Sequence, residues 1–474
     1  MTQATEPAPR GAAALARAVR DGRRTAESIA GDALDRAHAV QGACNAFTAI
    51  DAPGATAAAR AIDAARARGE TLGPLAGVPV VIKDMTPTAG LPTTLGSWTT
   101  GEGVDGPTGG EDAVVVARLR AAGAVVIAKS TTPELAHSSL TASPRYGITR
   151  NPHDRSRTSG GSSGGSAVAV ATGVVPFAEG TDMGGSVRIP AGACGTVGFK
   201  PSLGRIPMTI LPTPIDTISH FGPLAASVAD AVAFVAATAG PSDLDLLSQP
   251  TRFDAAACAP ASLRGLRLAH SPDLGYCAVS DAVRTSIESA LDALRAAGAE
   301  VREVRLPWTR DVLDAWLAKW GVLLATLAGD GSARPRERMD PALVRLIEAG
   351  ERLGAVELKR TELRQRAMAA DLAAVFADHD ALVCPTNATE APPVEASDDD
   401  FEAVDADGRL LTFDMAHAFN MVPTHPAISL PVDPAPSGLP VGLQVVGPRY
   451  ADERLLAVAW ALEGVLGVAP AASV

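Results

Sequence analysis

The feature that most constrains the fold is a run of small residues, GGSSGGSAVAVATG at 160–173, followed closely by a second glycine-rich run, GTDMGGSVRIP at 180–190. Both runs lie between apolar segments that must form part of a core. A flexible Gly/Ser linker belongs between domains, so that explanation fits poorly. The two runs therefore need an explanation within one packed domain.

Composition limits the classes of protein to which the chain can belong. Its 474 residues are 47% hydrophobic and 20% charged, which suits a folded globule and excludes a disordered chain. The net charge of −12 provides no basic surface for phosphate backbones, so we expect no nucleic-acid ligand. The five cysteines stand far apart and predict reduced, mostly buried thiols; they are Cys44, Cys194, Cys258, Cys277 and Cys384.

The order of the expected elements indicates an α/β fold. A buried strand at 75–84 ends near Lys83, and a helix at 113–123 leads into a second apolar strand at 124–130. The same alternation returns after residue 250. We therefore expect one large domain over residues 1–474, with a central mixed sheet covered by helices on both faces.

Two helical regions are expected outside this sheet. Residues 1–70 have apolar positions at helical spacing and predict an N-terminal segment of two or three helices. Residues from about 308 to 377 are helical throughout, and three tryptophans, Trp308, Trp316 and Trp320, stand at their start. We expect this region to form a variable cover over an apolar active-site pocket.

No membrane span or export signal is evident in the sequence. The longest apolar stretch, Ala167 to Phe177, is too short to cross a bilayer, and the N-terminus lacks the apolar core of a signal peptide. A cytoplasmic location without membrane contact is therefore the expectation.

The glycine-rich runs favour acyl-transfer chemistry over nucleotide binding. Neither run has the Gly-Lys-Ser/Thr ending of a phosphate-binding loop. Glycines at 184 and 185 instead let the backbone approach a substrate closely, so that the amides of Met183, Gly184, Gly185 and Ser186 can face one oxygen. This arrangement predicts an oxyanion hole beside a nucleophilic serine.

A serine nucleophile needs a base to remove its proton. The eight histidines are scattered, and nothing in the sequence pairs one of them with a carboxylate. Lys83 follows the apolar run AGVPVVI, and burial disfavours the charged form of a lysine. Lys83 is therefore the candidate base.

With these residues in view, the chain resembles the amidase signature family. The run from Gly160 to Arg205 reproduces the family's signature almost position for position, and further matches stand in GVPVVIKD, KSTTPELA, CPT, FNMVPTHPAISLP and LPVGLQVVG. The resemblance implies a Ser, cis-Ser, Lys triad of Ser186, Ser162 and Lys83, with a cis peptide bond between Gly161 and Ser162. It also implies supporting roles for Ser163, Asp182 and Arg188, and neither a metal nor an organic cofactor.

The resemblance leaves two activities open. One is a stand-alone serine amidohydrolase that cleaves apolar or aryl amides, with carbamates, urethanes and esters as further substrates. The other is the glutaminase (A) subunit of a tRNA-dependent amidotransferase. The segment NMVPTHPAISLP departs from the Leu, Gly and small-residue pattern usual in such subunits, which favours the stand-alone enzyme. The expected partner is a small-molecule amide, and homodimers are common among similar enzymes.

A catalytically silent binding protein with the same fold is a third alternative. Such a protein would have no need for all three of Lys83, Ser162 and Ser186, which are present together. We therefore expect an enzyme.

Overall fold

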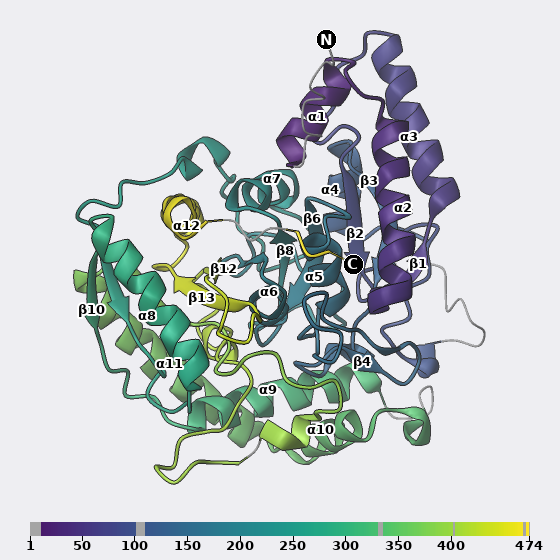
Figure 1. Ribbon diagram of the computed structural model, residues 1–474. Helices are drawn as coiled ribbons and strands as arrows, with labels where there is room; N and C mark the ends of the chain where they lie inside the picture. Colours follow the sequence, from purple (N-terminus) through teal and green to yellow (C-terminus); the bar gives the residue numbers. More distant parts are fainter. Residues whose placement is uncertain (1–10, 101–109, 330–334, 402, 468–470, 474) are drawn as a thin grey trace.

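A computed structural model describes residues 11–100, 110–329, 335–401, 403–467 and 471–473 (Figure 1). Its described strands form an 11-stranded mixed sheet and a small two-stranded one. The large sheet contains, in spatial order, β1 (Phe47–Ile50), β3 (Val125–Ser130), β2 (Pro79–Lys83), β6 (Phe177–Asp182), β8 (His220–Ala225), β7 (Val197–Lys200), β12 (Ala427–Val432), β13 (Val441–Val446), β11 (Ala381–Pro385), β9 (Arg267–His270) and β10 (Glu300–Glu303). The small sheet pairs β4 (Ala142–Ser143) with β5 (Gly147–Ile148).

The large sheet combines parallel and antiparallel pairs, which confirms the expected mixed α/β fold. Strand β2 runs parallel to both β3 and β6, and β9 runs parallel to β10 and β11. Across the middle of the sheet, each strand is antiparallel to its neighbour, in the order β6, β8, β7, β12, β13 and β11. Every residue of β2, β6 and β12 is buried, as expected for strands covered on both faces.

Two groups of helices cover the sheet (Figure 1). The described helices are α1 (Ala12–Arg20), α2 (Ala26–Cys44), α3 (Ala52–Ala67), α4 (Val114–Ala121), α5 (Gly164–Ala171), α6 (Arg188–Cys194), α7 (Val228–Thr238), α8 (Asp281–Ala296), α9 (Asp311–Ala328), α10 (Pro341–Arg352), α11 (Ala355–Asp378) and α12 (Asp452–Leu466). Helices α4, α7, α12 and α8 contact one another in a row, whereas α2, α5 and α6 make a second connected group.

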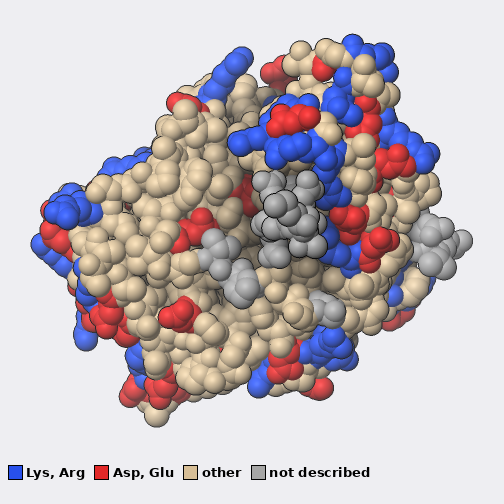
Figure 2. Space-filling model, turned by 45° about the horizontal axis from the view of Figure 1, so that its top comes forward, with Lys and Arg blue, Asp and Glu red and all other residues tan. Residues whose placement is uncertain are grey.

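The N-terminal segment contains helices α1, α2 and α3, and residues 1–10 of the predicted segment lie outside the described part of the chain. Strand β1, which the sequence did not reveal, lies between α2 and α3 and pairs with β3 at the edge of the sheet. In the view of Figure 2, acidic and basic side chains are interspersed on the surface of the molecule. Ion pairs such as Arg24–Asp32 (2.7 Å) and Arg60–Glu27 (2.7 Å) join the two kinds of charge.

The predicted cover corresponds to α9, α10 and α11, and its residues 330–334 lie outside the described residues. Trp308 stands at the start of this region but does not line the pocket. Its side chain is buried away from the pocket, where its indole Nε1 donates to Asp371 Oδ2 (3.0 Å) and its ring packs 5.9 Å from that of Phe419. Only Trp316 and Trp320 of the three tryptophans line the cavity discussed below.

All five cysteines are unpaired and buried. Among the described helices, none combines the length and the apolar character needed to cross a bilayer.

Candidate active site

Lys83 is the last residue of the fully buried strand β2, and its own side chain is buried. Its Nζ donates hydrogen bonds to Ser162 Oγ (2.7 Å) and to Thr181 Oγ1 (2.9 Å). Burial lowers the pKa of Lys83 to about 7, although the negative charges of Glu179 and Asp182 oppose this shift. A substantial fraction of Lys83 is therefore neutral near pH 7, as a general base requires.

Ser162 lies just before helix α5, and the peptide bond between Gly161 and Ser162 is cis, as the family resemblance implies. A Cβ atom at Gly161 would lie 2.9 Å from the carbonyl carbon of Ser139, so only glycine fits there. The next residue connects the two glycine-rich loops, because Ser163 N donates to Ser186 O (3.1 Å). Ser163 Oγ also donates to Thr181 O (3.3 Å).

Ser186 lies in the loop between β6 and α6, and only 9% of its surface is exposed. Its Oγ makes no hydrogen bond to another residue in the described ranges. The amides of Met183, Gly184 and Ser186 likewise donate to no residue that the structure describes. In contrast, the Gly185 amide donates to Asp182 Oδ1 (2.8 Å). This bond occupies one of the four amides predicted for the oxyanion hole and leaves three for a substrate.

Asp182 and Arg188 form a buried ion pair at the base of this loop. Arg188 Nη2 lies 2.9 Å from Asp182 Oδ1, and Arg188 Nε lies 3.0 Å from Asp182 Oδ2. Burial alone would raise the pKa of Asp182, but the charge and hydrogen bonds of Arg188 lower it well below its usual value. Asp182 is therefore an ionised carboxylate. It also accepts a hydrogen bond from the Val187 amide (3.3 Å) and so fixes the loop that carries Ser186.

Several polar partners of this pair were not predicted from the sequence. Asn420 Nδ2 donates to Asp182 Oδ1 (2.9 Å), and Arg188 donates to Asn420 Oδ1 (2.7 Å) and to Gln444 Oε1 (2.5 Å). Their one signal in the sequence is their position as polar residues inside the apolar segments FNMVP and GLQVV. Thr181 and Glu179, which adjoin Lys83, were also missed.

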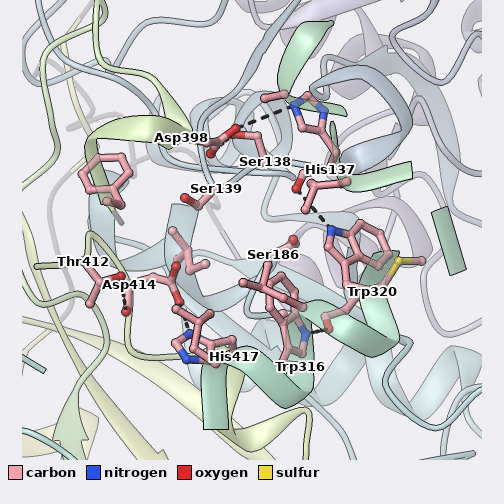
Figure 3. A pocket seen from close by; sticks show the side chains of 18 of the residues that line it. His137, Ser138, Ser139, Ser186, Trp316, Trp320, Asp398, Thr412, Asp414 and His417 are labelled. Atoms are coloured by element: carbon pink, nitrogen blue, oxygen red, sulfur yellow. Dashed lines mark hydrogen bonds and ion pairs between the residues drawn. The ribbon is translucent and has the colours of Figure 1, made fainter. Parts of the chain in front are cut away.

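Ser186 opens into a cavity of about 490 Å³ (Figure 3). Helix α9 contributes Trp316 and Trp320, whose rings stack with centroids 6.1 Å apart. Helix α10 lines the cavity through residues within 342–349, and the other walls come from residues within 136–139, 398–401 and 412–417. The cavity therefore combines an aromatic wall with polar walls around the hydroxyl of Ser186.

Both histidines that line this cavity lie near carboxylates, which the sequence did not reveal. His137 Nε2 lies 3.7 Å from Asp398 Oδ2, and its Nδ1 lies 2.8 Å from the carbonyl oxygen of Glu134.

The second of these histidines is more tightly held. His417 Nδ1 lies 3.0 Å from Asp414 Oδ1, and its Nε2 lies 2.8 Å from the hydroxyl of Tyr276. Both ring nitrogens are thus engaged by these two groups rather than by Ser186. The geometry favours Lys83 over His417 as the base.

Comparisons with known proteins show the family to which the chain belongs. The family described as Amidase matches residues 29–456. The A subunit of a glutamyl-tRNA(Gln) amidotransferase from Acidothermus cellulolyticus is 37% identical, over 93% of this chain and 91% of the relative. An acylamidase from Rhodococcus erythropolis is 34% identical, over 95% of this chain and 94% of the relative.

The fold also matches a solved structure of a bacterial aryl acylamidase of the amidase signature enzymes. The two have a TM-score of 0.87 and 26% sequence identity, and the match covers 96% of each chain. The match of the family over most of the chain and the two relatives above 30% identity lead to one conclusion: this chain belongs to the amidase signature family of amidohydrolases.

Proposed function

We propose that the chain is a stand-alone serine amidohydrolase that cleaves apolar or aryl amides through an acyl-enzyme on Ser186. The observation that carries the proposal is the buried Lys83–Ser162 hydrogen bond of 2.7 Å behind a cavity that Ser186 lines. Neutral Lys83 accepts a proton from Ser162, and Ser162 accepts one from Ser186 as its Oγ attacks the carbonyl carbon.

The attack places negative charge on the carbonyl oxygen of the substrate. The amides of Met183, Gly184 and Ser186 donate hydrogen bonds to this oxygen. Removal of one such donor typically slows catalysis by about 10² to 10³. Asp182 supports the site indirectly, because its bonds to Gly185 and Val187 fix the loop that carries these amides.

The proton then returns along the same relay to the nitrogen of the leaving group. The C–N bond breaks, the amine departs, and the acyl group remains bonded to Ser186 Oγ. Water attacks this ester, with its proton passing to Ser162 and Lys83, and releases the carboxylic acid.

The walls of the cavity favour substrates that carry large, apolar groups. The stacked rings of Trp316 and Trp320 offer a flat surface to an aryl or extended apolar group, and Ile189 and Leu317 lie on the same cavity. Carbamates, urethanes and esters present the same electrophilic carbon, so we expect them as further substrates of the same site.

The alternative function is that of a glutaminase subunit in a tRNA-dependent amidotransferase. It is favoured by the identity of 37% to the A subunit of a glutamyl-tRNA(Gln) amidotransferase. The aromatic wall of Trp316 and Trp320 supports the stand-alone enzyme instead, since glutamine has no aryl or extended apolar group to place against it.

Hydrolysis of a matched panel by the purified lone chain separates the two functions. The panel contains glutamine, a short aliphatic amide, an aryl anilide and an aryl carbamate, and Ser186→Ala is the control. We expect turnover of the anilide and the carbamate, little on glutamine, and none in the variant. Activity on glutamine alone, or only when partner subunits are added, would support the amidotransferase function.

A further inference from the structure

Trp316, a cavity residue of the helical cover, is hydrogen bonded to the loop that carries Ser186. Its indole Nε1 donates to the carbonyl oxygen of Met183 (2.8 Å). The ring also lies against the next residue, because a Cβ atom at Gly184 would fall 2.2 Å from Trp316 Cζ2. The indole therefore contacts both residues of the Met183–Gly184 peptide bond.

The position of the Trp316 ring is itself fixed by two ring contacts. The ring stacks on Trp320 with an interplanar angle of 21°, and it also packs against His417, with ring centroids 5.8 Å apart and an interplanar angle of 43°. His417 is held in turn by Asp414 and Tyr276. Figure 3 shows Trp316 beside Ser186, with Trp320 and His417 to either side. These contacts leave the indole little freedom to turn away from the Met183 carbonyl.

Fixing this carbonyl also fixes the amide of Gly184. In a planar trans peptide bond the C=O and the N–H point in opposite directions, so the direction of one determines that of the other. The Gly184 amide has no acceptor among the described residues. The far side of the loop is anchored separately, through the bonds from Gly185 and Val187 to Asp182.

We propose that Trp316 is a positioning residue, whose indole N–H holds the Met183–Gly184 peptide bond in the orientation that directs the Gly184 amide to the oxyanion of the reaction. The inference rests on the function proposed above and deepens it. It makes the helical cover part of the catalytic geometry, because α9 carries Trp316. Trp316 acts through the Gly184 amide and does not itself bond to the reacting oxygen.

The test compares Trp316→Phe with Trp320→Phe. Each variant keeps an aromatic ring on the same wall and removes one indole N–H. The N–H of Trp320, however, donates to His137 O (3.3 Å) and not to the loop of Ser186. Two probes are titrated: an aryl trifluoromethyl ketone, which adds reversibly to a serine and forms an oxyanion, and the matching trifluoromethyl alcohol, which cannot add.

In Trp316→Phe we expect kcat and the affinity for the ketone to fall together by about 10- to 100-fold, less than for deletion of an oxyanion donor. The affinity for the alcohol should change by less than about threefold, because no charge develops on it. Trp320→Phe should preserve the ratio of the two affinities. The inference is overturned if Trp316→Phe also preserves this ratio, whatever its effect on KM.

Active-site titration with a fluorophosphonate counts the molecules that have a reactive serine. Expressing kcat per counted molecule removes the effect of any misfolded fraction in a variant. The same experiment separates the two proposals. A wild-type chain that neither turns over amides nor binds the ketone through Ser186 contradicts the proposed function. A Ser186-dependent wild-type activity with an unchanged ratio in Trp316→Phe contradicts only the role of Trp316.

Discussion

At the scale of single residues, the relay depends on the charge state of Lys83. Burial lowers its pKa to about 7, so the neutral base increases as the pH rises through that value. We predict that kcat/KM falls roughly tenfold per pH unit below about pH 7 and levels off above it. A pH profile of anilide hydrolysis measures this directly.

The variant Lys83→Ala provides the control for this profile. It should lose most of the activity and also the inflection near neutral pH, with the loss smaller at high pH, where hydroxide partly replaces the base. A wild-type rate that stays flat between pH 5 and about pH 8 would remove Lys83 from the role of base.

The Asp182–Arg188 ion pair has a consequence for stability. Asp182→Asn leaves the charge of Arg188 buried without its partner, and we expect the free energy of unfolding to fall by about 3 kcal/mol or more. The exposed pair of Arg23 and Asp21 supplies a matched control, because Asp21→Asn should change the free energy of unfolding by less than about 0.5 kcal/mol. Urea unfolding of the three proteins gives both values.

The same ion pair predicts a pH dependence. Because the folded state lowers the pKa of Asp182, its contribution is fully present above the unfolded pKa and is lost as the pH falls. The stability difference between wild type and Asp182→Asn should therefore shrink below about pH 4. A difference that stays constant into stronger acid would contradict a charged Asp182.

Sequence reasoning identified the residues with a distinctive motif and missed those without one. Ser186 and Lys83 stand in unusual local patterns, and the family resemblance implied that Ser162 lies with them. Thr181 and Asn420 are ordinary polar residues whose roles arise only from contacts across the fold. The Gly185 amide was expected to face the substrate, but the nearby carboxylate of Asp182 accepts its hydrogen bond instead.

At the scale of elements, the packing of α9 against α10 shapes the cavity. The two helices meet at glycines, and a Cβ atom at Gly350 would fall 2.1 Å from the carbonyl oxygen of Gly321. Gly350→Ala should force the helices apart, lower the free energy of unfolding by about 1 to 3 kcal/mol, and raise KM for the aryl anilide. Calorimetry and steady-state kinetics measure the two effects.

Gly464 in α12 is the matched control for this helix contact, since a Cβ atom there would meet nothing within 4 Å. Gly464→Ala should raise the free energy of unfolding by about 0.5 to 1 kcal/mol, because alanine favours a helix. If the two substitutions had the same effect, close packing of α9 on α10 would not be what fixes the cavity wall.

Element prediction succeeded where the pattern was long and failed where it was short. The buried strand that ends near Lys83 was predicted from its apolar, β-branched run, and the helix predicted at 113–123 corresponds to α4. Strand β1 has only four residues at the sheet edge and cannot be distinguished from a connection between helices. The three tryptophans near the start of the cover look alike in the sequence, but Trp308 contacts Asp371 and Phe419 whereas Trp316 and Trp320 line the cavity.

At the scale of the whole molecule, one sheet brings the reacting groups together from distant parts of the chain. Strands β2 and β6 are parallel neighbours, so Lys83 and the loop that carries Ser186 emerge at the same edge. The alternation of strands and helices predicted the class of this fold. It could not predict the order of the strands, or that residues near 137, 398 and 414 share one cavity.

The most direct test of the central claim is rapid-quench mass spectrometry of the purified chain during turnover of an aryl anilide, followed by peptide mapping. We predict a transient mass increase equal to that of the acyl group, located on Ser186 and absent in Ser186→Ala. Rapid turnover without this adduct, or with the acyl group on another residue, would contradict an acyl-enzyme mechanism at Ser186.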